Sequence, residues 1–317
     1  MLRAGQAGEG FDINGFDAVL ASLATDGKGN IDLGSNTLTV GLNENDTEFE
    51  GTVFGDASSK FVKDGAGTMT FGADIESYFG TFEVAGSTFV WEASGLAGTV
   101  YDVTVGAEGA FVNNSTLADV NLTVSGLLSG AGGASVTVAD GGFLAPGDSP
   151  GTMVVNELIW QDGGEYLWEI NDVTGTAGND PGWDKIEVNG AWDISGLSFG
   201  GFTIDIISLE PDNDVGPLAN FDWMDVYSFE IMSFDSLIGT FGQDLFILDT
   251  GFFLNPFQGF WSLSVSGNSL WLNYTFDSQA DVTLPIPEPS AASLMLIGLL
   301  LLFRRPLTAR IARRRGC

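Results

Sequence analysis

Carboxylates are the most abundant reactive side chains of this protein, because its 317 residues include 42 acids, no histidine and one cysteine, Cys317. Two acid pairs, Glu165 with Glu169 and Asp180 with Asp184, have the residue types that a glycosidase or a Ca²⁺ site uses. A glycosidase needs its two carboxyls at a defined separation in space, which spacing along a β-rich chain does not establish. Neither the EF-hand pattern nor a repeated calcium-binding glycine motif occurs. We therefore interpret these acids as solvated side chains of turns.

The remaining composition excludes several classes of function. Without histidine, the Ser-His-Asp, Cys-His and zinc-hydrolase mechanisms lose an essential group. A single thiol excludes disulfide frameworks and cysteine-based metal sites within one chain. The formal net charge of −31 repels phosphate backbones, so no nucleic-acid partner is expected. We predict a protein that is not an enzyme and has no cofactor. The alternative is a carbohydrate-active β-helix enzyme, either a polysaccharide lyase or a glycosidase.

Four tryptophans are candidates for glycan contact, because exposed aromatic rings can stack on sugars: Trp160, Trp168, Trp183 and Trp192. Trp160 and Trp168 are eight residues apart, which would keep them on one face of a continuous strand, but glycines at 163 and 164 interrupt that strand. The other interpretation, which we favour, is that all four are ordinary core aromatics. A glycan-binding module is kept as a second alternative function.

The elements that must position these residues are short β-strands. Glycine accounts for 44 residues, and Val, Thr, Phe and Leu are abundant, which is typical of many strands joined by tight turns. Apolar residues recur with period two in many short segments, which places their side chains on one face. These segments are 37–40, 68–71, 81–84, 88–91, 101–105, 121–124 and 135–138. The sequence therefore predicts an all-β protein.

Internal similarity favours stacked repeats over residues 25–200. Residues 103–109 resemble residues 136–142 at an offset of 33, which fits one or two coils of a solenoid. We predict a parallel β-helix here, and the alternative is a β-sandwich, which also uses short strands. Residues 201–281, which include the charged linker 210–214, are expected to form a β-rich cap with a hairpin over 260–274 around Gly267 and Asn268.

The C-terminal segment 282–317 has three parts in a fixed order. A Pro287-Glu288-Pro289 motif precedes an apolar run from Ala291 to Phe303. Six of the 11 basic residues then fall in the last 14 positions, namely Arg304, Arg305, Arg310, Arg313, Arg314 and Arg315. As a helix, the apolar run covers roughly 20 Å, which is short of the ~30 Å hydrocarbon core. By the positive-inside rule the arginines stay cytoplasmic, and the acidic body lies across the membrane. A buried C-terminal helix of a soluble domain is the other interpretation.

This tail resembles the PEP-CTERM sorting signal of Gram-negative bacteria. The matching residues are the Pro287-Glu288-Pro289 motif, the membrane segment Ala291 to Phe303 and the arginine-rich end. The resemblance implies that an exosortase recognises the tail and removes it, with release or attachment of the protein at the outer surface. Such proteins are common in bacteria that make extracellular polysaccharide.

The repeat region resembles the passenger segments of autotransporter adhesins, with their autotransporter-associated β-strand repeats. The matching residues are 63–71 (KDGAGTMTF), 78–87 (YFGTFEVAGS) and 144–152 (LAPGDSPGT), in that order. The resemblance implies a right-handed parallel β-helix on a cell surface, and it does not imply a ligand. The chain departs from autotransporters at its C-terminus, where the sorting tail stands in place of their secretion machinery.

We expect an exported, non-catalytic surface or extracellular-matrix protein, built as an adhesin-like rod and held by its C-terminus in the inner membrane during sorting. Its expected partners are the exosortase and extracellular polysaccharide or other surface components. Residues 1–24 contain no apolar export signal, so we expect the natural start to lie further upstream. The acidic body can associate weakly with Ca²⁺ without a dedicated site.

Overall fold

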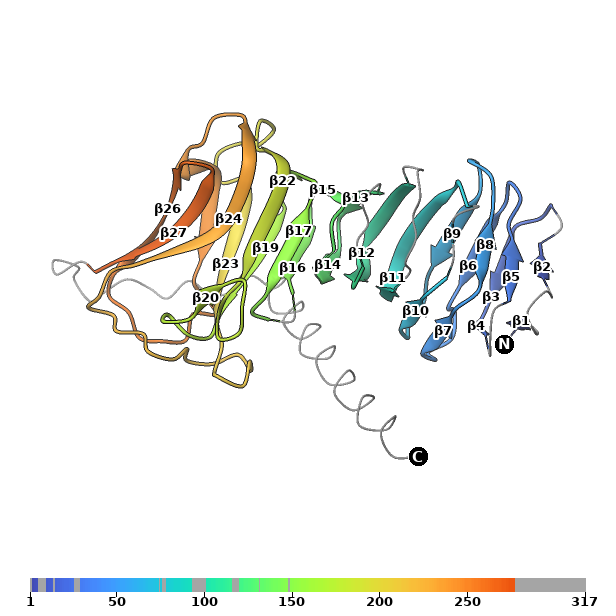
Figure 1. Cartoon of the computed structure of the whole chain (residues 1–317), viewed down its shortest axis with the longest axis horizontal. Coiled ribbons are helices and arrows are strands. Elements are labelled where there is room, and N and C mark those ends of the chain that lie inside the picture. The colour runs from blue at the N-terminus through green and yellow to red at the C-terminus, as the bar shows by residue number, and fades with distance from the viewer. Residues whose placement is uncertain are drawn as a thin grey trace.

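The protein is built almost entirely from β-strands stacked in a row. The structure, a computed structural model, describes residues 2–276 apart from 5–9, 14, 26–28, 74, 76–77, 93–100, 116–119, 131 and 148. These described residues form 27 strands and one short 3-10 helix, η1 (Gln243–Leu245). The strands lie side by side along the long axis, from β1 (Leu2–Ala4) at one end to β26 (Phe260–Ser266) and β27 (Ser269–Thr275) at the other (Figure 1). The all-β prediction is confirmed.

A first ladder of parallel strands runs through most of this row. Each strand pairs with the next in parallel register, and the inward residues follow one another, as Leu38, Phe61 and Phe82 do. The ladder contains β3 (Ala18–Leu20), β6 (Thr37–Val40), β9 (Lys60–Lys63), β11 (Thr81–Trp91), β12 (Tyr101–Asn113), β13 (Val120–Val124), β15 (Ser135–Val138), β18 (Glu157–Trp160), β22 (Lys185–Asp193) and β24 (Tyr227–Ile238).

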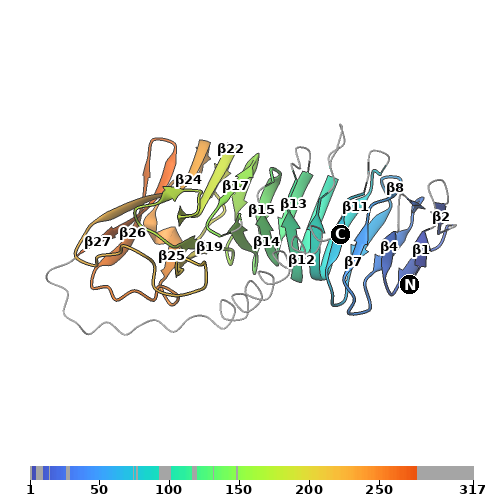
Figure 2. The same cartoon turned by 60° about the horizontal axis from the view of Figure 1, so that its bottom comes forward.

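A second parallel ladder runs beside the first. Its strands are β7 (Thr47–Phe49), β10 (Met69–Phe71), the second halves of β11 and β12, β14 (Leu127–Gly130), β16 (Phe143–Pro146), β19 (Glu165–Ile170), β23 (Phe202–Ser208) and β25 (Phe246–Asp249). At its N-terminal side, β1 pairs in parallel with β4 (Leu23–Thr25). The long strands β11 and β12 each belong to the first ladder with their first half and to the second ladder with their second half. In the middle of the molecule, single strands therefore pass from one ladder into the other (Figure 2).

Shorter parallel groups complete the cross-section. At the N-terminal end, β2 (Gly10–Asp12), β5 (Asn30–Asp32) and β8 (Thr52–Phe54) pair in parallel. Towards the C-terminal end, β17 (Thr152–Val155) pairs with β22, which pairs with β24. The small strands β20 (Thr176–Ala177) and β21 (Gly182–Trp183) belong to an excursion between β19 and β22.

Parallel pairing contradicts the β-sandwich alternative, because sandwiches are built from antiparallel strands. The pairing also accounts for the internal repeat. Val103 is in register with Leu122, and Leu122 is in register with Val136, so the 33-residue offset spans two steps of the first ladder. The predicted boundary at residue 200 stays a prediction, although both ladders continue past that point into β23, β24 and β25.

Alternating side chains of the ladders form one buried core along the row. In the first ladder Leu38, Phe61, Phe82, Val103 and Leu122 are each at most 2 % exposed. Fully burying such a side chain stabilises the fold by about 1.5–3 kcal/mol relative to leaving it in water. No single rung can bury its own inward face, so each depends on both of its neighbours for this stabilisation.

Glycines occupy tight corners where one ladder passes into the next. A Cβ added to Gly126 would lie 2.2 Å from the carbonyl oxygen of Gly106, and one added to Gly142 would lie 2.1 Å from that of Val124. These distances are far below van der Waals contact, so only glycine allows the backbones to approach this closely. The high glycine content of the chain therefore has a direct structural cause at these corners.

The C-terminal end of the row changes to antiparallel pairing. β24 pairs with β27, and β27 pairs with β26 in a hairpin whose turn contains Gly267, with φ of +60°. The hairpin predicted over 260–274 is thus confirmed. The described part of the chain contains no helix with the length and hydrophobicity of a transmembrane span. The predicted sorting segment 282–317, with its motif, apolar run and arginines, lies outside the described residues.

Candidate functional site

The tryptophans considered for glycan contact are core residues in three of the four cases. Trp160, Trp168 and Trp192 are all 0 % exposed. Trp160 stacks on Phe202 with ring centroids 4.0 Å apart and meets Trp192 edge-on at 5.0 Å. The glycan-contact hypothesis is therefore wrong for these three, and the core interpretation is confirmed. They point inward because strand alternation places each of them in an apolar row.

Trp183 is only half-buried, but its ring is engaged with the protein. Its Nε1 donates a hydrogen bond to the backbone carbonyl of Glu230 at 3.0 Å. The ring meets Phe229 edge-on, with centroids 5.1 Å apart. This contact ties the excursion between β19 and β22 to β24, which is a structural role.

Two of the acids considered for catalysis, Asp180 and Asp184, lie in the same excursion, and the other two lie in β19. Asp184, which directly precedes β22, is 0 % exposed, and Glu169 in β19 is 3 % exposed. Oδ1 of Asp184 accepts the backbone N–H of Gly151 at 2.7 Å, and its Oδ2 accepts the backbone N–H of Glu169 at 3.0 Å. The backbone carbonyl of Asp184 also accepts the Trp168 Nε1 at 2.9 Å. Our interpretation of these acids as solvated is therefore wrong for Asp184 and Glu169, which are buried.

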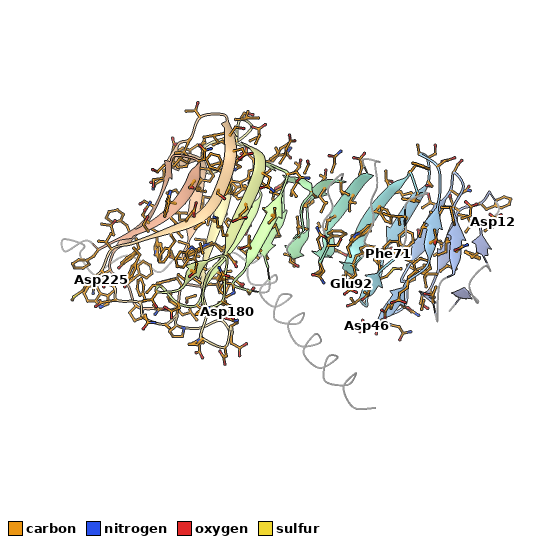
Figure 3. The ribbon with its side chains drawn as sticks, viewed as in Figure 1. Asp12, Asp46, Phe71, Glu92, Asp180 and Asp225 are labelled. Carbon is orange, nitrogen blue, oxygen red and sulfur yellow. The ribbon has the colours of Figure 1, made fainter. Side chains whose placement is uncertain are left out.

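Asp180 lies in the same excursion and is exposed, as the interpretation of solvated turn acids requires (Figure 3). Its Oδ1 accepts the Nδ2 of Asn171 at 2.7 Å, and its Oδ2 accepts the Nδ2 of Asn213 at 2.9 Å. Asn171 is 1 % exposed and also donates to the Oδ1 of Asn213 at 2.7 Å. The three side chains form a closed amide–carboxylate network that joins two loops.

Sequence reasoning missed this network. Asn213 belongs to the stretch 210–214 that we interpreted as a charged linker, and Asn171 follows β19 without any motif. The one available signal was the density of Asn and Asp in both stretches, which favours hydrogen-bonded turns without specifying which turns meet. The linker is in fact pinned to the body, because Val215 packs against an outer apolar cluster that contains Leu167 and Ile207.

The arrangement of these acids suits structure better than catalysis. In both Asp180 and Asp184, each carboxylate oxygen accepts a hydrogen bond from another group of the protein. A glycosidase instead presents one carboxyl to the leaving oxygen and the other to the sugar or to a water. Within the described part of the chain, no group of three or more His, Cys, Asp and Glu side chains is arranged to hold a metal ion.

The buried acids have one clear electrostatic effect. Burial raises the pKa of the Tyr166 hydroxyl well above its ordinary value, and the nearby charges of Asp184 and Glu169 raise it further. Tyr166 is 0 % exposed, and its hydroxyl donates to the backbone carbonyl of Ile231 at 3.3 Å. The hydroxyl therefore remains protonated and links β19 to β24.

Acidic side chains are spread over the whole length of the outer surface, from Asp12 near one end to Asp225 near the other (Figure 3). Hydrogen bonds from Ser198 lower the pKa of Asp162, and hydrogen bonds from serines likewise lower that of Asp56, so both remain ionised. The three lysines among the described residues already have partners. Lys60 pairs with Glu83, Lys185 lies 3.3 Å from both Glu187 and Glu230, and buried Lys63 donates to the backbone carbonyls of residues 64 and 65. The surface is thus strongly anionic.

Comparison with known proteins adds no family assignment. No family model matches the chain, and no curated protein matches it significantly.

Proposed function

We propose that this is an exported, non-catalytic protein of the cell surface or extracellular matrix, an adhesin-like rod whose C-terminal PEP-CTERM signal is processed by an exosortase. The observation that carries the proposal is the order of the tail, in which Pro287-Glu288-Pro289, the apolar run 291–303 and the arginines follow directly upon a body of opposite charge. In this proposal the tail holds the chain in the inner membrane until cleavage, and the body then reaches the surface or the medium.

The body is suited to such a role as a right-handed parallel β-helix. Support for this finer description comes from the two long parallel ladders, from the core that runs along them and from the glycine corners between them. Repeated backbone ladders give rigidity over the length of the row. The anionic surface keeps the rod soluble and can bridge to other surface components through cations.

A polysaccharide lyase or glycosidase is the less favoured function. Two of the four acids considered for it, Asp180 and Asp184, are engaged with backbone and amide donors, and three of the four tryptophans considered for sugar contact are in the core. A protein that scaffolds or adheres needs neither group in an open cleft.

The test is mass spectrometry of the native protein, intact and after digestion, from fractionated cells. We expect a mature chain that ends near Pro289, lacks Arg304 to Arg315 and occurs at the surface or in the medium. Replacing the Pro287-Glu288-Pro289 motif by alanines should leave the tail in place, whereas Pro211→Ala, at an exposed proline of the body, should be processed normally. A cytoplasmic chain that still carries Cys317 would overturn the proposal.

A further inference from the structure

One aromatic side chain of the C-terminal hairpin lies on a polar face. Strand alternation in β27 directs Leu270 and Leu272 into the core, where both are 0 % exposed, and it directs Trp271 outward. The chain buries four other tryptophans completely or almost completely, namely Trp91, Trp160, Trp168 and Trp192. Trp261 is also buried, whereas Trp271, like Trp183 and Trp223, is only half-buried.

The neighbours of Trp271 on this face are all polar. Glu230 of β24 and Ser264 of β26 are in register with it on either side. Ser269 and Asn273 precede and follow it by two residues on the same strand and therefore share its face. The indole thus lies in a ring of hydroxyl, amide and carboxylate groups.

These polar groups are held in place by one another. Asn273 donates from Nδ2 to the Oγ of Ser264 at 3.0 Å and accepts at Oδ1 from the Oγ of Ser228 at 2.7 Å. On the other side, Ser269 donates to Oε1 of Glu230 at 2.6 Å, and Lys185 lies 3.3 Å from Oε2 of the same carboxylate. A planar amide and a planar carboxylate fixed beside an aromatic ring lose little conformational entropy when a ligand binds.

The chemistry of this face matches a sugar chain. A pyranose ring has an apolar C–H face, which can lie on the negative face of an indole, and an equatorial rim of hydroxyls, which can bond to amide and carboxylate oxygens. Charge selects among sugar polymers. The protein has a net charge of −31, and Glu187 and Glu230 share one lysine, Lys185, at this face, so a polyanion would be repelled.

We infer that the outward face of β24, β27 and β26 binds neutral polysaccharide, with Trp271 as the stacking platform and Asn273 and Glu230 as hydrogen-bonding side chains. The inference deepens the proposed surface role and relies on it only for access to extracellular polysaccharide. Binding by the purified chain and location in the cell are measured separately, so the two can fail independently.

Affinity electrophoresis of the full chain tests the inference, with the neutral polymers hydroxyethylcellulose, galactomannan, xylan and dextran in the gel, and with the anionic polymer alginate. We expect at least one neutral polymer to retard the wild type and alginate not to retard it. Trp271→Ala should weaken the binding by roughly tenfold, and Trp271→Phe, which keeps an aromatic face, should weaken it less. Phe199→Ala is the matched control, because Phe199 is an aromatic residue, 83 % exposed, outside this face.

Four results would overturn the inference. The first is that none of the neutral polymers retards the wild type. The second is that Trp271→Ala, with wild-type near-ultraviolet circular dichroism, is retarded as strongly as the wild type. The third is that Trp271→Ala abolishes a wild-type dimer in sedimentation and leaves retardation unchanged, since the face would then be a contact between copies. Tight binding of alginate would refute the neutral class.

Discussion

Substitution of Asp184 by asparagine measures whether this buried acid holds the fold. Its two oxygens accept the backbone N–H groups of Gly151 and Glu169 at 2.7 and 3.0 Å. The amide of asparagine has one acceptor oxygen, so one of these buried N–H groups would face an NH₂ group and lose its partner. An unsatisfied buried donor costs about 1–3 kcal/mol, and weakening of the remaining charge-assisted bond adds to this cost. Relief from burying a charge offsets part of it.

We therefore expect Asp184→Asn to lower the free energy of unfolding by about 2–3 kcal/mol. The assay is urea unfolding followed by tryptophan fluorescence, to which buried Trp168 contributes through an indole that donates to the backbone carbonyl of residue 184. Asp180→Asn is the matched control, because that side chain is exposed: the asparagine oxygen can keep the hydrogen bond from buried Asn171, and water can satisfy the half-exposed amide of Asn213. Its cost should be about 1 kcal/mol or less. If Asp184→Asn is as stable as the wild type, the structural assignment of this acid is refuted.

Two further predictions follow from the corners and the core. Gly142→Ala should destabilise the protein by roughly 2 kcal/mol or more in the same urea assay, because the new Cβ would lie 2.1 Å from the carbonyl oxygen of Val124. Gly196→Ala is the control. Its added carbon has no atom within 4 Å, so it should change stability by less than about 0.5 kcal/mol. Equal effects of the two would contradict the account of the corners. Because the folded pKa of Tyr166 is raised, the folded state keeps a proton that the unfolded chain loses above pH ~10, so stability should fall as pH rises through this range. Tyr166→Phe should lose less stability than the wild type between neutral and alkaline pH, and an unchanged pH dependence would contradict this.

The strands could be predicted because strand alternation is a local property of the sequence. Segments 37–40 and 135–138 coincide with β6 and β15, and the alternation of buried and partly exposed residues follows the predicted period. The hairpin could be predicted equally well, because a Gly-Asn turn between two alternating segments pairs these segments with each other. These features depend on residues that are close in the chain.

The candidate site was less predictable because it depends on pairing between distant segments. Nothing near Asp184 in sequence shows that Gly151 donates to it, and nothing near Asp180 shows that Asn213 completes its network. The burial of Lys63 could not be predicted from the nearby sequence either. Lys63 occupies an inward position of the first ladder, in register with Val40 and Val84, and it is accommodated only because its Nζ reaches turn carbonyls at 3.0 and 3.1 Å.

The antiparallel end of the row accounts for the position of the proposed binding face. A parallel ladder leaves an edge that can template another strand, and at this edge β27 pairs antiparallel with β24 and β26 pairs antiparallel with β27. The same hairpin is the last element of the described residues: β27 ends at Thr275, and the proposed sorting motif begins at Pro287. A connection of this length spans at most roughly 45 Å. In the proposed attachment at the outer surface near Pro289, this connection would hold the Trp271 face close to the cell that carries it.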